Sequence, residues 1–213
     1  MEFCWVSMIL LVSYCYLSSS SSSSLVQSGL AVDSPQYTLV RSESDFEIRL
    51  YGESSWVTAL VRGNSFRNST KSGFHRLYQY IHGANVNSIR FTMTAPVLTS
   101  IITPQTNVSI YLVRTYIASE SPPQPNPELN LQIDKWRSHC VAVRNFPGFA
   151  RDDNVDKEVE ALLSSLNKHL TGTTTIIQDK SSYTIAQYNA SRHLTGRLNQ
   201  VWINVTVPGC PAY

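Results

Sequence analysis

A repeated order of secondary structure is the feature that most restricts the fold of this chain. In the first half, apolar and polar residues alternate as in strands, Ser65 offers an N-cap, and residues 66–81 have the periodicity of a helix that ends at Gly83. The same order of strands, helix and strands recurs about 85 residues later, beyond a proline-rich segment at 121–127. Neither copy has an apparent core of its own. We therefore predict one α+β domain, in which duplicated strand/helix/strand units form a distorted antiparallel β-barrel flanked by two helices related by a pseudo-twofold axis.

The positions of the individual elements follow from the same patterns. The second helix is expected to begin at a cap formed by Asp152 or Asp153 and to end near Leu170, before Gly172. Pro96 is expected at a bend or an edge, because it has no N–H to donate to a sheet. The predicted strands span residues 37–40, 46–51, 56–61, 89–93, 97–102, 108–116, 131–136, 140–146, 173–177, 183–188 and 201–207.

Composition excludes several classes of function. The 213 residues are 42% hydrophobic, which is enough to bury the core of one domain. Lys and Arg number 17 against 15 Asp and Glu and form no basic stripe, so we expect no nucleic-acid partner. The chain has no Gly-x-Ser-x-Gly, His-Glu-x-x-His, Gly-x-Gly-x-x-Gly or P-loop sequence, and no Cys-x-x-Cys pair. We therefore expect a binding protein without catalysis of its own.

The N-terminal residues have the composition of a secretory leader. The apolar run at 5–17 is shorter than the stretch of about 20 residues that spans a bilayer, and seven serines follow it at 18–24. The first residues include Glu2 and no Lys or Arg, which is unusual for a leader, and a buried N-terminal helix is the alternative. We predict that residues 1–24 are a signal peptide, that no later segment spans a membrane, and that the mature protein is extracellular or vacuolar.

Cysteines and sequons agree with passage through an oxidising compartment. Cys4 and Cys15 belong to the leader, so Cys140 and Cys210 remain, and we expect these two to form a disulfide; two free thiols are the alternative. Four Asn-x-Ser/Thr sequons predict N-glycosylation, though not at every site. They are Asn68, Asn107, Asn189 and Asn204.

One face of the first predicted helix carries most of the chemistry. Phe74, Leu77 and Ile81 form the stripe that is expected to pack on the sheet. A neighbouring stripe, spaced i, i+4, i+7 and i+11, brings a cation, two imidazoles and a phenol into line. Such a stripe can bind a flat, aromatic and acidic molecule, because imidazole ligates haem iron, lysine meets carboxylates and tyrosine stacks. An ordinary solvated face is the alternative for these four residues, which are Lys71, His75, Tyr78 and His82.

Several motifs, in the same order along the chain, resemble those of the SOUL haem-binding family. The longest runs from Gly73 to Asn85, and residues 93–97 resemble the family signature Met-Thr-x-Pro-Val. Together the motifs cover residues 35–207, leave 208–213 as a C-terminal tail, and look most like those of plant members with a secretory leader. The other matching segments are 46–52 with Trp56, 122–127, 146–149, 188–189 and 199–202.

The resemblance implies a distorted antiparallel barrel with two helices, and non-covalent binding of haem or another tetrapyrrole. In the family, the pocket lies beside the first helix and the loop before the last strand. Lys71, Arg192 and Arg197 are then expected to meet the propionates, and His75 or His82 to ligate iron. Carried over residue by residue, the implied pocket consists of Lys71, His75, Tyr78, Gln79 and His82 on the helix and Tyr188, Arg192, His193, Leu194 and Arg197 in the loop.

Three positions depart from the family pattern. Leu50 stands where some relatives have a histidine proposed as an axial ligand, so we expect haem iron to be weakly ligated or bound through a helix histidine. Ser191 replaces a proline of the pocket loop and thereby creates the Asn189 sequon, and Gln200 replaces a glutamate. Two other functions remain open. One is a general small-molecule binding domain, as in bacterial drug-sensing effector-binding domains of similar fold, and the other is a hydrolase that uses His75 or His82 as acid or base.

Overall fold

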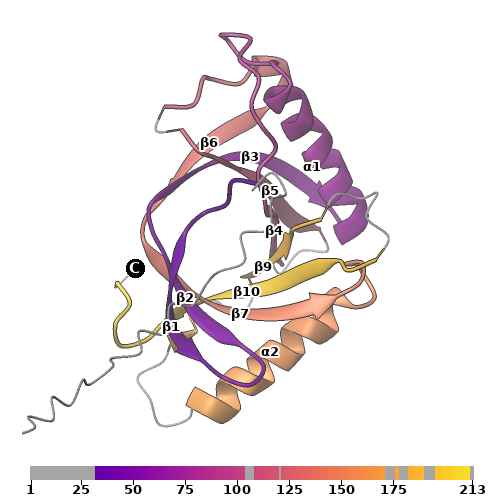
Figure 1. Ribbon diagram of the computed structural model, residues 1–213. Helices are drawn as coiled ribbons and strands as arrows, with labels where there is room; N and C mark the ends of the chain where they lie inside the picture. The colour runs from indigo at the N-terminus through magenta and orange to yellow at the C-terminus, as the bar shows by residue number, and fades with distance from the viewer. Residues whose placement is uncertain are drawn as a thin grey trace, which may run out of the picture. The chain divides into compact units, whose positions relative to one another are not determined.

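The computed structural model describes residues 32–103, 108–119, 121–170, 176–177, 182–189 and 195–211. This part of the chain contains one curved sheet and two helices of 16 residues each, α1 (Phe66–Ile81) and α2 (Val155–Leu170) (Figure 1). A short 3-10 helix spans Pro127–Leu129. The strands are β1 (Tyr37–Ser42), β2 (Glu47–Tyr51), β3 (Ser54–Gly63), β4 (Val97–Ile102), β5 (Ser109–Ile117), β6 (Leu131–Trp136), β7 (His139–Pro147), β8 (Ile176–Ile177), β9 (Ser182–Gln187) and β10 (Leu198–Thr206).

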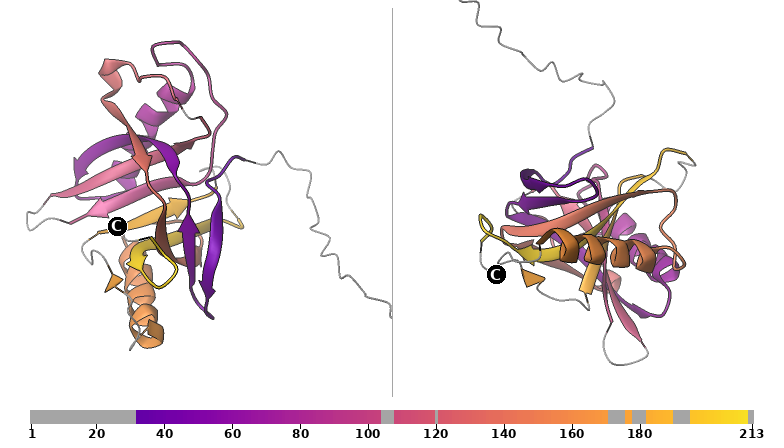
Figure 2. Two further views of the ribbon diagram at one scale, coloured as in Figure 1. Left: turned by 90° about the vertical axis from the view of Figure 1, so that its left-hand side faces the viewer. Right: turned by 90° about the horizontal axis from the view of Figure 1, so that it is seen from below.

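The sheet is antiparallel and curls into a half-barrel. Its strands follow the order β1-β2-β7-β10-β9-β4-β5-β3-β6, and the short β8 pairs with β10. The two halves of the sequence meet where β4 pairs with β9, from Val97 opposite Gln187 to Ile102 opposite Ser182. Figure 2 shows the same curvature from two further directions. The predicted α+β class, with a barrel-like antiparallel sheet and two helices, is therefore confirmed.

Both helices pack on the same face of the sheet. Val113, beneath α1, pairs with Thr99, which in turn pairs with Ile185; Ile185 pairs with Val201, beneath α2. Residues directly opposite one another in neighbouring strands point to the same side. Alternate residues such as Trp202 point to the other face, where they belong to a separate buried aromatic cluster.

Local sequence signals set the bounds of α1. Ser65 is its N-cap, and the Ser65 hydroxyl accepts a hydrogen bond from the Asn68 backbone N–H at 3.3 Å. Leu77 is fully buried against the sheet. Gly73 brings the helix close to β5, because a Cβ added there would lie 2.5 Å from Cγ2 of Val113. The predicted helix at 66–81 and its cap are confirmed.

The core beneath α2 is cross-linked to the end of the chain. Val155, Leu162 and Leu166 of α2 are buried in the same cluster as residues of β7 and β10. Cys140, on β7, forms a disulfide with Cys210, and the two Cα atoms are 5.9 Å apart. The predicted pairing of these two cysteines is therefore present in the structure.

The acidic residues before α2 do not cap it as predicted. The helix begins at Val155, and the side chain of Asp152 turns instead to the N-terminus of α1. There its carboxylate accepts hydrogen bonds from the backbone N–H of Phe66, from that of Arg67 at 3.4 Å and from the Ser65 hydroxyl at 3.1 Å. The expectation was wrong because free N–H groups of another helix lie within reach, and sequence spacing does not reveal them.

The segment at 89–93 is a loop and not the predicted strand. Asn85 is buried and fixes the loop, because its amide donates to the backbone oxygen of Ile89 at 2.7 Å and accepts from the Ile89 N–H at 3.0 Å. Phe91 stacks on Tyr80 of α1, with ring centroids 5.6 Å apart. Phe91 and Met93 of the segment pack on the core cluster beneath α1, and this packing overrides the alternating pattern. Of the strand expected at 173–177, the described residues are those of β8.

Candidate functional site

An open groove of about 570 Å³ runs along the exposed side of α1. The helix presents this face to solvent because Leu77, Tyr80 and Ile81 occupy the opposite face, which packs on the sheet. The residues lining the groove are Asn68, Lys71, Ser72, Phe74, His75 and Tyr78. Three of the predicted site residues, Lys71, His75 and Tyr78, therefore lie together.

Aromatic rings form a row along the same helix. Tyr78 is 45% exposed, and its ring lies 6.3 Å from that of Phe74 and 3.9 Å from the imidazole of His82. The tyrosine and imidazole rings are stacked, and Nδ1 of His82 lies 2.8 Å from the backbone oxygen of Tyr78. This hydrogen bond fixes the orientation of the imidazole at the end of the helix. The row offers flat apolar surface to a ligand without a rearrangement of the core.

The charge of α1 is entirely positive. The helix contains Arg67, Lys71 and Arg76 and no Asp or Glu. Arg76 is held to the sheet side, because its guanidinium donates to the backbone oxygens of Leu60 at 2.7 Å and Asn130 at 3.2 Å. Lys71 is exposed and lines the groove. An acidic ligand would meet a cation and no carboxylate among the described lining residues.

The remaining predicted site residues do not line this groove. Gln79 on α1 and His82, the C-cap of α1, are exposed but are not among the lining residues. Tyr188 directly follows β9, and Arg197 directly precedes β10. Leu50 packs on the core cluster that contains the buried side chains of α2. Arg192, His193 and Leu194, together with the Asn107 sequon and the predicted leader, lie outside the described residues.

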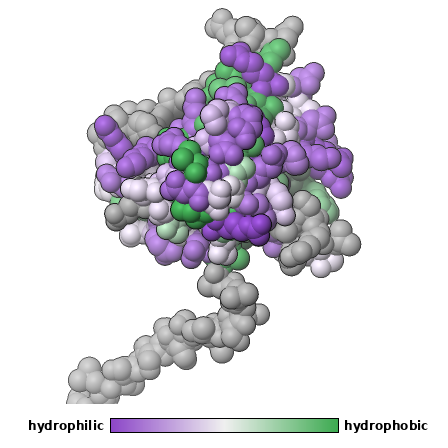
Figure 3. All heavy atoms as spheres, turned by 90° about the horizontal axis from the view of Figure 1, so that it is seen from above, coloured by the Kyte–Doolittle hydropathy of each residue, from purple (hydrophilic) through white to green (hydrophobic). Residues whose placement is uncertain are grey.

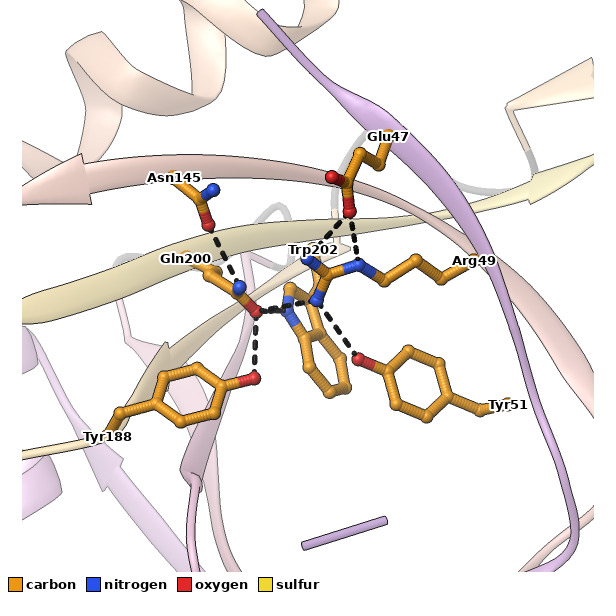
Figure 4. Close-up of polar contacts among 7 residues, drawn as sticks. All are labelled: Glu47, Arg49, Tyr51, Asn145, Tyr188, Gln200 and Trp202. Atoms are coloured by element: carbon orange, nitrogen blue, oxygen red, sulfur yellow. Dashed lines mark hydrogen bonds and ion pairs between the residues drawn. The ribbon is translucent and has the colours of Figure 1, made fainter. Parts of the chain in front are cut away.

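Tyr188 belongs to a hydrogen-bonded network on the other face of the sheet (Figure 4). Its hydroxyl donates to Oε1 of Gln200 at 2.9 Å, and the same oxygen accepts from the Trp202 indole at 2.8 Å and from Arg49 at 3.4 Å. Arg49 is paired with Glu47 at 2.7 Å. Burial raises the pKa of Tyr188, so the phenol remains a proton donor at neutral pH. In Figure 4 these side chains point toward one another, and we assign them to the stability of the sheet interior.

Gln200 acts in this network both as an acceptor and as a donor of hydrogen bonds. Its oxygen accepts from three donors, while its Nε2 donates to Oδ1 of Asn145 at 2.9 Å. A carboxylate has no N–H for this last bond. Gln200 thus has its partner on β7 and is not among the residues that line the groove on α1.

Arg197 is buried, with 7% of its surface exposed. Its guanidinium lies over the ring of Phe149, 4.3 Å from the ring centroid, and donates to the backbone oxygen of Asn189 at 3.1 Å. Such contacts hold the turn before β10. The guanidinium of Arg197 thus contacts other parts of the fold, whereas the side chain of Lys71 is exposed to solvent.

The loop after α1 adds an exposed apolar surface that sequence reasoning missed. Val86 is 69% exposed and Ile89 is 43% exposed. Figure 3 looks onto this end of the molecule and shows apolar side chains framed by hydrophilic ones. The loop is anchored to α1 by Asn85, which donates to the backbone oxygen of Tyr80 at 3.2 Å. The Tyr80 hydroxyl donates to the Pro123 oxygen of the neighbouring segment at 2.8 Å, and burial raises the pKa of Tyr80 to about 12.

Asn68, Ser72 and Phe74 were likewise missed as lining residues, although helical spacing from Lys71 and His75 places them nearby.

The groove residues fit a haem or another tetrapyrrole. A groove of about 570 Å³ is within the range of small-molecule sites, about 300–1,000 Å³. Tyr78 and Phe74 would contact the ring, His75 supplies an imidazole for iron, and Lys71 supplies a cation for a carboxylate. In the part of the chain that the structure describes, no group of three or more His, Cys, Asp or Glu could hold a metal ion by itself.

Comparison with known proteins assigns this architecture to a family. The model of the SOUL heme-binding protein family matches residues 32–204. Human heme-binding protein 2 is 34% identical over 164 residues, covering 74% of this chain and 77% of the human protein. Heme-binding protein 1 of Xenopus laevis is 26% identical over 162 residues, covering 74% of this chain and 82% of the frog protein. The chain therefore belongs to the SOUL heme-binding protein family.

Solved structures extend the likeness at the level of fold. EcmrR, in its complex with DNA, has a TM-score of 0.57 at 10% identity, with 76% of this chain and 57% of the EcmrR chain covered. At this identity the match shows a shared fold alone. Among the described residues, no helix is both long and apolar enough to cross a membrane.

Proposed function

We propose that this protein binds haem or a related tetrapyrrole non-covalently in the groove on α1. One observation carries the proposal: in a chain of the SOUL heme-binding protein family, an exposed groove brings together Tyr78, His75 and Lys71. Each contributes a different interaction with such a ligand, namely ring contact, iron ligation and ion pairing with a propionate. The names of the relatives, heme-binding proteins 1 and 2, support the same ligand class.

Burial of the ring supplies most of the affinity in this proposal. Apolar area removed from water contributes about 25 cal/mol per Å², and the open groove covers one side of a flat ligand. After the cost of association, this supports a dissociation constant on the order of micromolar. An imidazole at α1 would supply a ligand for the iron of haem. His75 is the first candidate because it lines the groove, and His82 is the second because its ring continues the aromatic row.

We propose that the protein acts by binding and not by catalysis. Among the described groove residues, His75 is a possible acid or base, and no carboxylate accompanies it. A hydrolase would need a further group to orient that imidazole or to activate a nucleophile.

We propose further that the protein is a plant-type secretory glycoprotein, either extracellular or vacuolar. The disulfide between Cys140 and Cys210 supports an oxidising compartment. The leader-like composition of residues 1–24 and the sequons support the same route.

The duplicated origin of the fold is also a proposal. Exchange of β2 with β6, β3 with β7, β4 with β9 and β5 with β10 reproduces the pairings among these eight strands. For example, β3 pairs with β5 and β6, and β7 pairs with β10 and β2. This internal correspondence supports two copies of one unit.

Absorption titration of the mature protein with haem and with iron-free protoporphyrin tests the proposed function. If burial of the ring supplies most of the affinity, both ligands bind with similar strength.

His75→Ala, His82→Ala and the double variant then identify the iron ligand, because loss of an imidazole shifts the Soret band of haem and leaves protoporphyrin binding unchanged. His169→Ala on α2 is the control for loss of an imidazole elsewhere. No saturable binding of either ligand would refute the proposal.

A further inference from the structure

We propose that Asn68 carries an N-linked glycan that covers the groove on α1 and restricts access to it. The proposal rests on the proposed function in two respects, secretory routing and the use of this groove. Asn68 is exposed, is followed by Ser69 and Thr70 as an Asn-x-Thr sequon, and is itself one of the residues that line the groove.

Helix geometry places Asn68 on the same face as the groove residues. Asn68 precedes Lys71 and Ser72 by one turn and His75 by two turns, so the four side chains share one face. At about 1.5 Å per residue, His75 lies about 10 Å further along the helix axis. A branched oligosaccharide of several sugars attached at the first turn therefore extends over the region occupied by Lys71 and His75.

The other described sequons differ in position. The side-chain oxygen of Asn189 accepts from the Leu198 N–H at 2.7 Å, so this side chain is engaged in the turn before β10. Asn204 is exposed near the end of β10, between Ile203 and Val205, which belong to the core cluster beneath α2. It therefore points to the opposite face of the sheet, away from both helices. Asn204 is the matched control for a glycan that leaves the groove open.

The modification would take place before the fold is complete. Ser69 is 4% exposed, and the Thr70 hydroxyl lies 3.1 Å from that of Thr99 on β4. Because these two residues are packed against the fold, the glycosylation machinery must reach the sequon on the nascent chain, before α1 packs on the sheet. Nδ2 of Asn68 attacks C1 of a lipid-diphosphate-linked oligosaccharide, and a C1–N bond forms while the C1–O bond to the diphosphate breaks. The amide loses one proton, and the lipid diphosphate leaves.

Two measurements on the full chain secreted from eukaryotic cells test the inference. Mass spectrometry of glycopeptides gives the occupancy of Asn68. The rate at which diethyl pyrocarbonate modifies His75 reports access to the groove without any tetrapyrrole. We expect Asn68 to be occupied and His75 to react several-fold more slowly than in Asn68→Gln or in protein deglycosylated by an amidase after folding. Asn204→Gln should retain the slow rate.

The same samples separate this inference from the proposed function. Haem and protoporphyrin should bind several-fold more tightly to the deglycosylated protein than to the glycosylated form. An unmodified Asn68, or equal His75 rates with and without the glycan, would overturn the inference. Slow His75 modification in a protein that binds neither ligand would support coverage of the groove and refute the proposed function. Amidase treatment acts on folded wild-type protein, so the result does not depend on the folding of Asn68→Gln. Because the amidase leaves an aspartate at position 68, Asn68→Asp is the control for that charge.

Discussion

The helices α1 and α2 have the same length and pack on the same face of the sheet, yet their exposed faces differ. Counted from the first residue, the sixth, tenth and thirteenth positions are Lys71, His75 and Tyr78 in α1. In α2 these positions are Glu160, Ser164 and Asn167. A cation and two rings in one helix thus correspond to an anion and two small polar side chains in the other. The difference shows that the exposed residues of one helix can line a groove while both helices keep their packing on the sheet.

The buried faces of the two helices differ as well. The eighth residue is Gly73 in α1 and the fully buried Leu162 in α2. Gly73 brings α1 close to β5, whereas Leu162 fills the space between α2 and its sheet. The core beneath α2 also contains Cys140 and its disulfide. We infer that α2 belongs to the more heavily stabilised half, and that α1 combines close packing with an exposed site.

Removal of the disulfide should have the largest effect on stability. The bond closes a loop across 70 residues, and in the chain-entropy model this contributes about 4 kcal/mol. We expect Cys140→Ala with Cys210→Ala to lower the free energy of unfolding by that amount in a denaturant titration. Reductant should destabilise the wild type and leave the double variant unchanged. Uptake of two alkylating groups by denatured, unreduced mature protein would contradict the bond.

Leu162→Ala tests the packing role of α2. The side chain is fully buried, so its truncation should cost about 3 kcal/mol through lost burial and a residual cavity. Haem affinity, measured under conditions in which the variant remains folded, should be unchanged. A weaker affinity in folded Leu162→Ala would show that the core beneath α2 also supports the ligand site.

Gly73→Ala tests the close approach of α1 to the sheet. Alanine normally favours a helix over glycine by about 1 kcal/mol. Here its Cβ would lie 2.5 Å from Val113, so we expect a net loss of about 2 kcal/mol from overpacking. Ser164→Ala, at an exposed position of α2, is the control and should be close to neutral. Stabilisation by Gly73→Ala would mean that α1 can move away from β5 without cost.

Tyr78→Ala should separate binding from stability. The ring is 45% exposed, so its loss should change the free energy of unfolding by about 0.5 kcal/mol or less. Loss of its ring contact should weaken haem and protoporphyrin binding by about tenfold. Absorption titration checks the affinity and chemical denaturation checks the stability. Unchanged affinity for both ligands would remove Tyr78 from the site.

Lys71→Glu should have the smallest effect. A partly solvated ion pair with a propionate contributes about 1 kcal/mol or less, so binding should weaken several-fold at low salt. Added salt should reduce the difference between wild type and variant. Lys157→Glu, an exposed position of α2, is the matched charge reversal and should not change affinity. Equal weakening by both variants would indicate a long-range charge effect in place of a contact.

Local signals made part of this structure predictable. Ser65 and the glycine after the helix marked the bounds of α1, and alternation placed β4 and β6 at their observed residues. The spacing of Lys71, His75 and Tyr78 was sufficient to place them on one face. These features depend on residues within a few turns of one another.

Features that depend on side-chain contacts and packing were not predictable. The alternation at 89–93 is typical of a strand, but the side chain of Asn85 holds Ile89, and Phe91 stacks on Tyr80 of α1. The resemblance predicts Arg197 at the pocket mouth; in the structure the residue is buried and its guanidinium lies over Phe149, which the sequence does not show. Whether a charged side chain is presented to a ligand or used within the fold is decided by such tertiary contacts.

The Asp152 contacts connect the helix that carries the groove to the opposite half of the sequence. The turn before α2 supplies a carboxylate to the first free N–H groups of α1. Fraying of α1 at this end is therefore coupled to local unfolding of that turn. An interaction that stabilises the first turn of α1 also makes local unfolding near residue 152 rarer. A ligand held by Lys71 would in this way extend hydrogen-exchange protection to a segment it does not touch. Separation of the chain into its two similar halves would leave the binding helix without part of its own cap.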